Sequence, residues 1–106
     1  MNNHEYIISS LAPDIKETVT YLLGNGYNLI DEITDRIVLQ NKIDYLYNTI
    51  VFDYVKGIAD CFISEDKKMK HYVCRSISFP VILNKDLFDI TIQKLIEYYI
   101  QEKNNH

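Results

Sequence analysis

The sequence predicts an α+β fold: an antiparallel β-meander of four to five strands, with an N-terminal and a C-terminal helix packed on one face. Both ends of the chain place apolar residues at helical spacing, whereas the middle holds short β-branched and aromatic runs separated by polar turns. A chain of 106 residues has the size of one domain with one core, so residues 1–106 are expected to form a single domain. An all-helical bundle is the alternative.

The first helix is expected over residues 13–24. Pro13 suits its first turn, and Gly24 or Gly26 can end it. Its apolar residues recur at helical spacing: Ile15, Val19, Leu22 and Leu23.

The last helix is expected over residues 85–102. Asn84 is its expected N-cap, and Asp86 lies in its first turn. One stripe is expected along this helix: Leu87, Thr91, Leu95, Tyr98 and Tyr99.

The segment NTIVFDYVKGIADCFIS, residues 48–64, supports two interpretations. If residues 46–62 form a helix, its apolar side chains lie on one side, and Asp53 and Asp60 lie on the opposite, polar side. The same residues are rich in Tyr, Thr, Ile, Val and Phe, which favour strands, and the internal Gly57 costs a helix about 1 kcal/mol. We therefore predict a hairpin.

The turn sets the register of this hairpin. A two-residue turn at Lys56-Gly57, with Gly57 at positive φ, places Asp53 directly opposite Asp60. Lys56 suits the first turn position poorly, so a three- to five-residue loop with a shifted register stays open. A shift by one residue would send the two aspartates to different faces. The expected core face consists of Ile50, Phe52, Tyr54, Ala59, Cys61 and Ile63. The expected opposite face consists of Val51, Asp53, Val55, Ile58, Asp60 and Phe62.

The remaining strands are expected on both sides of the hairpin. YNLIDEI (27–33) and RIVLQN (36–41) are short β-branched runs separated by a turn at Thr34-Asp35, although residues 29–40 can also be drawn as a helix. The segment 69–83 alternates, and Pro80 ends this strand or marks an edge. The residues that share one phase are Met69, Val73, Ile77 and Phe79.

Charge is distributed unevenly along the chain. The net charge is −4, but eight acidic and three basic residues lie between Asp31 and Asp66, and four basic residues with no acid follow in KKMKHYVCR (67–75). This pattern favours recognition of a basic protein over binding to a phosphate backbone, so no direct nucleic-acid binding is expected. A solvated surface without a partner stays open as the alternative.

Two features of the sequence suit a protein interface. Two opposed aspartates among apolar side chains lose solvation and repel each other, and a partner's Arg or Lys would relieve both effects. Nine tyrosines and no tryptophan are present, and tyrosine is enriched at interfaces. Composition bias of an A/T-rich gene also explains the tyrosine count.

No group of residues predicts catalysis, a metal site or a cofactor. His71 and Cys74 are three residues apart, which places them on opposite faces of a strand. A zinc site or a Cys–His nucleophile needs further ligands or partners that the sequence does not supply. GNG at 24–26 is expected to stop a helix, and KKMKHYVCR is expected to be a solvated turn. We therefore expect a protein that is not an enzyme.

The compartment predicted from the sequence is the cytoplasm. The start, MNNHEYIISSLAPD, lacks a basic region followed by an apolar one, and no apolar run approaches the length of a membrane span. Cys61 and Cys74 are too few for a disulfide framework, and both are expected to be small buried apolar residues.

The layout resembles that of the small α+β immunity proteins encoded beside bacterial polymorphic and contact-dependent growth inhibition toxins. The similarity lies in the order of a helix, GYNLIDE, RIVLQN, an apolar hairpin, a strand ending in ISFP and a closing helix, together with size, acidity and composition. It implies a cytoplasmic protein that binds a toxin domain and blocks its active or substrate-binding surface.

These observations together predict an immunity protein that neutralises a cognate basic nuclease toxin domain through an acidic, tyrosine-containing surface. Membrane binding is not expected, and the free protein is expected to be a monomer or a weak dimer. A self-associating structural or regulatory module is the alternative function. The residues predicted to bind the partner are Asp31, Glu32, Asp35, Asp44, Tyr45, Tyr47, Asp53, Asp60, Glu65 and Asp66.

Overall fold

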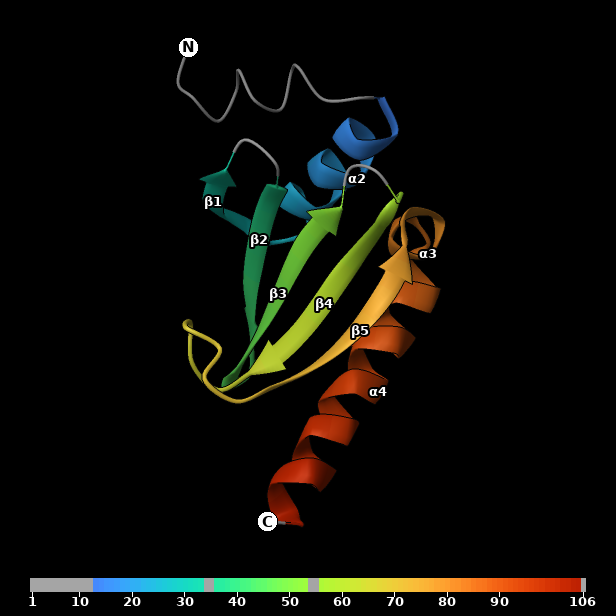
Figure 1. The fold of residues 1–106 in the computed structure, drawn as a ribbon. Helices are drawn as coiled ribbons and strands as arrows, with labels where there is room; N and C mark the ends of the chain where they lie inside the picture. Colours follow the sequence, from blue (N-terminus) through green and yellow to red (C-terminus); the bar gives the residue numbers. More distant parts are fainter. Residues whose placement is uncertain (1–12, 34–35, 54–55, 106) are drawn as a thin grey trace.

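The computed structural model of the chain describes residues 13–33, 36–53 and 56–105, except for the side chains of residues 31–33 and 36. It shows an α+β fold with a five-stranded antiparallel sheet (Figure 1). The predicted fold class is confirmed, and the all-helical alternative is wrong. The elements follow in the order α2 (Pro13–Leu23), β1 (Asn28–Ile33), β2 (Arg36–Ile43), β3 (Leu46–Asp53), β4 (Ile58–Ser64), β5 (Tyr72–Ser78), α3 (Phe79–Leu83) and α4 (Lys85–Asn104).

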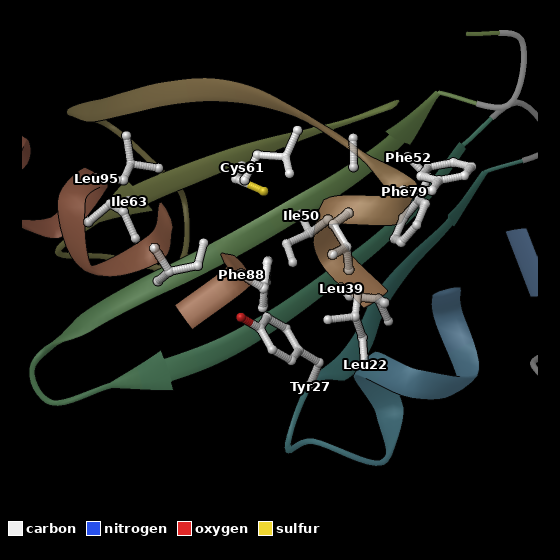
Figure 2. Close-up of a cluster of buried hydrophobic side chains, with 14 of the residues drawn as sticks. Leu22, Tyr27, Leu39, Ile50, Phe52, Cys61, Ile63, Phe79, Phe88 and Leu95 are labelled. Carbon is white, nitrogen blue, oxygen red and sulfur yellow. The ribbon is translucent and has the colours of Figure 1, made fainter. Parts of the chain in front are cut away.

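The sheet is a meander in which each strand pairs with the next strand of the chain. All three described helices lie on one face of it, which we call the inner face; the other is the outer face (Figure 1). The inner face and the helices enclose a single apolar core, in which Ile50, Cys61 and Ile63 are fully buried (Figure 2). The helices therefore use one face of the sheet and leave the outer face without a helical cover in the described part of the chain.

The first predicted helix is confirmed as α2, with Ile15, Val19 and Leu22 buried. The last is confirmed as α4, and Asn84 caps it by accepting a hydrogen bond from the Leu87 amide at 3.2 Å.

The predicted stripe of α4 is only partly correct. Leu95 and Tyr99 are buried, but Leu87 and Tyr98 are 49% and 51% exposed. The residues of α4 that contribute to the core are Phe88, Ile92, Leu95, Ile96 and Tyr99. Apolar residues occur around most of this helix, so spacing alone does not select the buried side.

The hairpin of β3 and β4 has a different register from the two-residue-turn prediction. Asp53 pairs with Ile58, and Val51 pairs with Asp60, so four residues (54–57) connect the strands. Gly57 takes a φ of 68°, as a tight connection requires, and the Lys56 amide donates a hydrogen bond to Asp53 Oδ1 at 3.1 Å. The longer-loop alternative is therefore correct.

The register is shifted by two residues from the predicted one, and because this shift is even, the two predicted faces are retained. The inner positions of β3 and β4 are buried, and both aspartates lie on the outer face. The predicted direct opposition of Asp53 and Asp60 is wrong, because they occupy diagonal positions. Tyr54 and Val55 lie outside the described residues.

The first two strands are confirmed with small changes in their bounds. β1 and β2 pair with a bulge between Leu29 and Asp31, and the helix drawn over 29–40 is wrong. The turn predicted at Thr34-Asp35 lies outside the described residues. A two-residue turn at Asp44-Tyr45, with Asp44 at a φ of 57°, joins β2 to β3.

The last strand is shorter than the alternating segment 69–83, in which Pro80 was expected to end the strand or to mark an edge. β5 begins at Tyr72, and the chain turns into the short helix α3 directly after Ser78. Pro80 lies in the first turn of α3, where its missing N–H has no intrahelical partner to lose. Phe79 enters the core with its ring 5.5 Å from that of Phe52, so burial of Phe79 accompanies the change from strand to helix (Figure 2).

Candidate interaction surface on the outer face

The outer face of β3 and β4 combines apolar side chains with the two aspartates. Its apolar members Val51, Ile58 and Phe62 are partly buried, and the register sets Val51 beside Asp60 and Ile58 beside Asp53. We call these five residues the outer patch. A partly buried apolar surround raises the electrostatic influence of a carboxylate, because less water screens it.

The carboxylate of Asp60 is oriented by a neighbouring strand. Ser76 on β5 pairs with Asp60, and its hydroxyl donates a hydrogen bond to Asp60 Oδ1 at 2.6 Å. An ionised carboxylate accepts several hydrogen bonds, so the bond from Ser76 fixes the group and leaves capacity for a partner's cation. Asp53 differs in role, because its Oδ1 accepts from the Lys56 amide and stabilises the β3–β4 loop.

Aromatic side chains extend the outer patch toward the edge of the sheet. The rings of Phe62 and Tyr72 meet edge to face with centroids 5.1 Å apart, and Tyr72 is 54% exposed. On the other side of the patch, the Lys42 ammonium lies 5.7 Å from the centre of the Tyr47 ring. Phe62 and Tyr72 thus add aromatic surface to one end of the outer patch, and aromatic residues are enriched in interface hot spots.

The other predicted acidic residues do not join the outer patch. Asp44 and Tyr45 form the β2–β3 turn, and Glu65 and Asp66 lie in the β4–β5 connection at the same end of the sheet. Tyr47 is on β3 near that end. Asp31 and Glu32 belong to β1, where their side chains are outside the described residues, and Asp35 lies outside them altogether.

The far end of the sheet is mixed in charge. Glu65 forms an ion pair with Lys103 of α4, and this hydrogen bond raises the pKa of Lys103. Asp66 accepts a hydrogen bond from the Lys70 amide at 3.1 Å, which holds the basic segment 67–70 beside the acids. The excess of acidic residues between positions 31 and 66 therefore does not form one continuous acidic surface among the described residues.

A cleft of about 530 Å³ opens at this same end, between the β4–β5 connection and the last turns of α4. Lys70, His71 and Tyr72 line one side of it, and Tyr99 and Lys103 line the other. Its charges are of both signs, so it offers no acidic site of the predicted kind.

The two cysteines occupy different environments. Cys61 is buried in the core, whereas Cys74 is exposed on β5, so the prediction that both are buried is wrong for Cys74. Partial desolvation by its neighbours, and secondarily the charge of Asp60, raises the pKa of the exposed Cys74 thiol, which leaves less thiolate at neutral pH. Cys74 and the exposed His71 are not placed as a nucleophile and base by any hydrogen bond in the described structure.

Within the described residues, no three His, Cys, Asp or Glu side chains gather as metal ligands. No described helix has the length and apolar character that a membrane crossing requires.

The sequence interpretation missed two contributors to this surface, Tyr72 and Ser76. Both lie on β5, and only the pairing of β5 with β4 brings them to Phe62 and Asp60. In the sequence they alternate with the apolar Val73 and Ile77, and this alternation could have placed Tyr72 and Ser76 on the outer face.

Comparison with protein families, with curated proteins and with solved structures finds no match for this chain.

Proposed function

We propose that this chain is a non-enzymatic inhibitory binding protein of the immunity type, which neutralises a basic nuclease toxin domain in the cytoplasm. The outer patch is the proposed contact surface. The observation that carries the proposal is the Asp60 carboxylate, which Ser76 orients among the partly buried Val51, Ile58 and Phe62. Asp31, Glu32 and the acids at the far end of the sheet are secondary in this proposal.

The charge of Asp60 and its apolar and aromatic neighbours support this kind of partner. A nuclease binds phosphates through Arg and Lys, and an oriented carboxylate can take the place of a phosphate in such a cleft. The apolar neighbours of Asp60 exclude water around the ion pair, while Tyr72 supplies an aromatic contact at low entropic cost. Binding is then expected to be fast and to weaken as salt increases.

The test uses the C-terminal domain of the protein encoded immediately upstream. Asp60→Asn removes the charge but keeps an oxygen that can accept from Ser76. We expect this change to weaken the complex by about tenfold or more in calorimetric titration, and Phe62→Ala to weaken it comparably. Both variants should lose protection of cells that express the toxin domain.

Glu97→Gln is the matched control, because it changes the net charge equally at an exposed position of α4, on the helical side of the sheet. Equal affinity of Asp60→Asn and the original protein would refute the outer patch as the contact surface. Absence of any complex with the upstream domain would refute the immunity function.

Self-association is the second candidate function, and one observation favours it. β5 pairs only with β4 in the described sheet, and its central residues Cys74, Arg75 and Ser76 are exposed. An edge of this kind can pair with the same strand of a second copy. Sedimentation of the isolated chain separates the two functions: a stable dimer that Arg75→Pro dissociates supports self-association, and a monomer supports a foreign partner.

A further inference from the structure

A notch lies on the inner side of the molecule, away from the outer patch, where the helices leave part of the sheet uncovered. It has a volume of about 280 Å³ and opens between the end of α2 and the first half of α4, with the end of β2 behind it. Small-molecule sites start near this volume, whereas dinucleotides and larger cofactors need more space.

The floor of the notch is apolar and rigid. Tyr27 and Phe88 lie side by side with ring centroids 6.4 Å apart, and both are buried (Figure 2). Ile92 and Ile96 continue the floor along α4. The Tyr27 hydroxyl donates a hydrogen bond to the buried Asn48 Oδ1, which holds the ring in place.

The rim along α4 is polar and carries one charge of each sign. Lys85, Asp89 and Gln93 follow one another at intervals of four residues, so they project from one line of the helix. Asn41 of β2 faces them from the other side. None of these four side chains has a hydrogen bond or an ion pair with another group in the described part of the chain.

Lys85 and Asp89 are neighbours that do not pair with each other. Their order, with the basic residue N-terminal, is the less favourable one for an ion pair at this spacing. A ligand that carries an anionic and a cationic group a few ångströms apart can satisfy both at once. The rim has no net charge, so it offers no general attraction to anions such as nucleotides.

We propose that the notch binds a free α-amino acid with an apolar side chain. The ligand carboxylate contacts Lys85, the ligand ammonium contacts Asp89, and the side chain packs on Phe88 and Ile92. The carboxamides of Gln93 and Asn41 supply further hydrogen bonds to the two charged groups. This proposal is independent of the toxin partner and of the outer patch.

Titration of the full chain with L-leucine, followed by amide chemical shifts in NMR spectra, tests the proposal. We expect saturable shifts at millimolar concentrations, confined to the residues that line the notch. Leucinamide lacks the carboxylate and 4-methylpentanoate lacks the ammonium, so each is expected to bind about tenfold more weakly or worse.

Two variants assign the charges to their partners. Asp89→Asn should weaken L-leucine binding about tenfold and leave 4-methylpentanoate binding unchanged, and Lys85→Met should weaken L-leucine binding but not that of leucinamide. Lys94→Met and Glu97→Gln, on exposed positions of the same helix away from the notch, are the controls. The NMR spectrum of each variant verifies its fold.

Three results would overturn the proposal. The first is the absence of saturable shifts at the notch with leucine, isoleucine, methionine and phenylalanine. The second is binding of leucinamide and 4-methylpentanoate as tight as that of leucine, which would make the notch a purely apolar site. The third is tighter binding of a nucleoside such as adenosine than of any amino acid.

Discussion

Replacing Tyr27 with Phe tests the polar connection inside the core. The Tyr27 hydroxyl donates a hydrogen bond to Asn48 Oδ1, and Asn48 Nδ2 donates to the Phe62 carbonyl at 3.1 Å. Tyr27 is 6% exposed and Asn48 is fully buried. Tyr27→Phe removes the only hydrogen-bond donor to Asn48 Oδ1 in the described structure, so a buried carbonyl oxygen is left without a partner.

The size of the effect follows from the cost of an unsatisfied buried acceptor. This cost is about 1–3 kcal/mol, since the ring stays in place and no cavity forms. For a domain of this length, 1 kcal/mol corresponds to a change of about 5 °C in Tm, so a loss of roughly 5–15 °C is expected. Urea unfolding followed by circular dichroism should show a lower midpoint with an unchanged slope.

A double variant separates the hydrogen bond from other effects of the substitution. In Tyr27→Phe with Asn48→Leu, the Asn48 carbonyl oxygen that Tyr27→Phe leaves unsatisfied is itself absent. The loss of the hydrogen bond to the Phe62 carbonyl is common to the single and the double Asn48 variants, so the combined loss should be smaller than the sum of the single losses. Tyr45→Phe is the control, because Tyr45 is 55% exposed and should stay within about 0.5 kcal/mol of the original protein. A Tyr27→Phe variant as stable as the Tyr45→Phe variant would refute the reasoning.

Two further predictions concern the backbone and the core thiol. Gly57→Ala should lower the free energy of unfolding by about 1–2 kcal/mol, because the residue has a φ of 68°. Gly24→Ala should not destabilise the protein, because the added methyl group would meet only ordinary contacts. Urea unfolding compares the two variants, and equal effects would contradict the role given to the positive φ of Gly57. Burial, with smaller contributions from Cys74 and Asp60, raises the pKa of Cys61, so the folded state retains the proton and stability should fall as pH rises above about 8.5, by up to about 1.4 kcal/mol per pH unit. Cys61→Ala should flatten this dependence in urea unfolding between about pH 8 and 10, and an equally steep dependence in the variant would contradict the prediction.

The sequence was sufficient for the two long helices and the five strands, but not for the short helix α3 or for the hairpin register. The alternation Ile50, Phe52, Ala59, Cys61, Ile63 defines the inner face whichever even shift the pairing takes, so the faces were predictable. The register depended on the loop, where a hydrogen bond from the Lys56 amide to Asp53 accompanies a four-residue connection. A hydrogen bond from the backbone to a nearby side chain can favour a longer loop over the two-residue turn that a single glycine indicates.

The buried side of α4 was not predictable for a different reason. Leu87 and Phe88 are adjacent and both apolar, yet Leu87 is exposed while Phe88 packs on Tyr27. The short helix α3 and the Asn84 cap directly precede α4, and the packing of α4 against the rest of the core buries Phe88 and leaves Leu87 exposed. Sequence spacing contains no information about that packing.

The candidate surface depends on contacts between residues that are far apart in the sequence, and a count of charges along the chain does not reveal these contacts. Glu65 is paired with Lys103, which is 38 positions away, so its charge is compensated by a distant element. Asp60 gains its orientation from Ser76 on the next strand. Among the chosen acids whose side chains the structure describes, Asp60 is both oriented by a neighbouring strand and surrounded by apolar groups.

The outer patch and the notch lie on opposite sides of the sheet, and Asn48 lies between them. Its side chain bonds to Tyr27 in the notch floor and to the carbonyl of Phe62, whose ring belongs to the outer patch. Coupling between two sites requires an element with two arrangements, whereas Asn48 is fully buried and both its Oδ1 and its Nδ2 have a hydrogen-bond partner in the described structure. We therefore expect saturation with L-leucine to leave the affinity for the toxin domain unchanged within about twofold in calorimetric titration. A larger change that Asn48→Leu abolishes would show that this connection transmits binding, and that the two faces do not act independently.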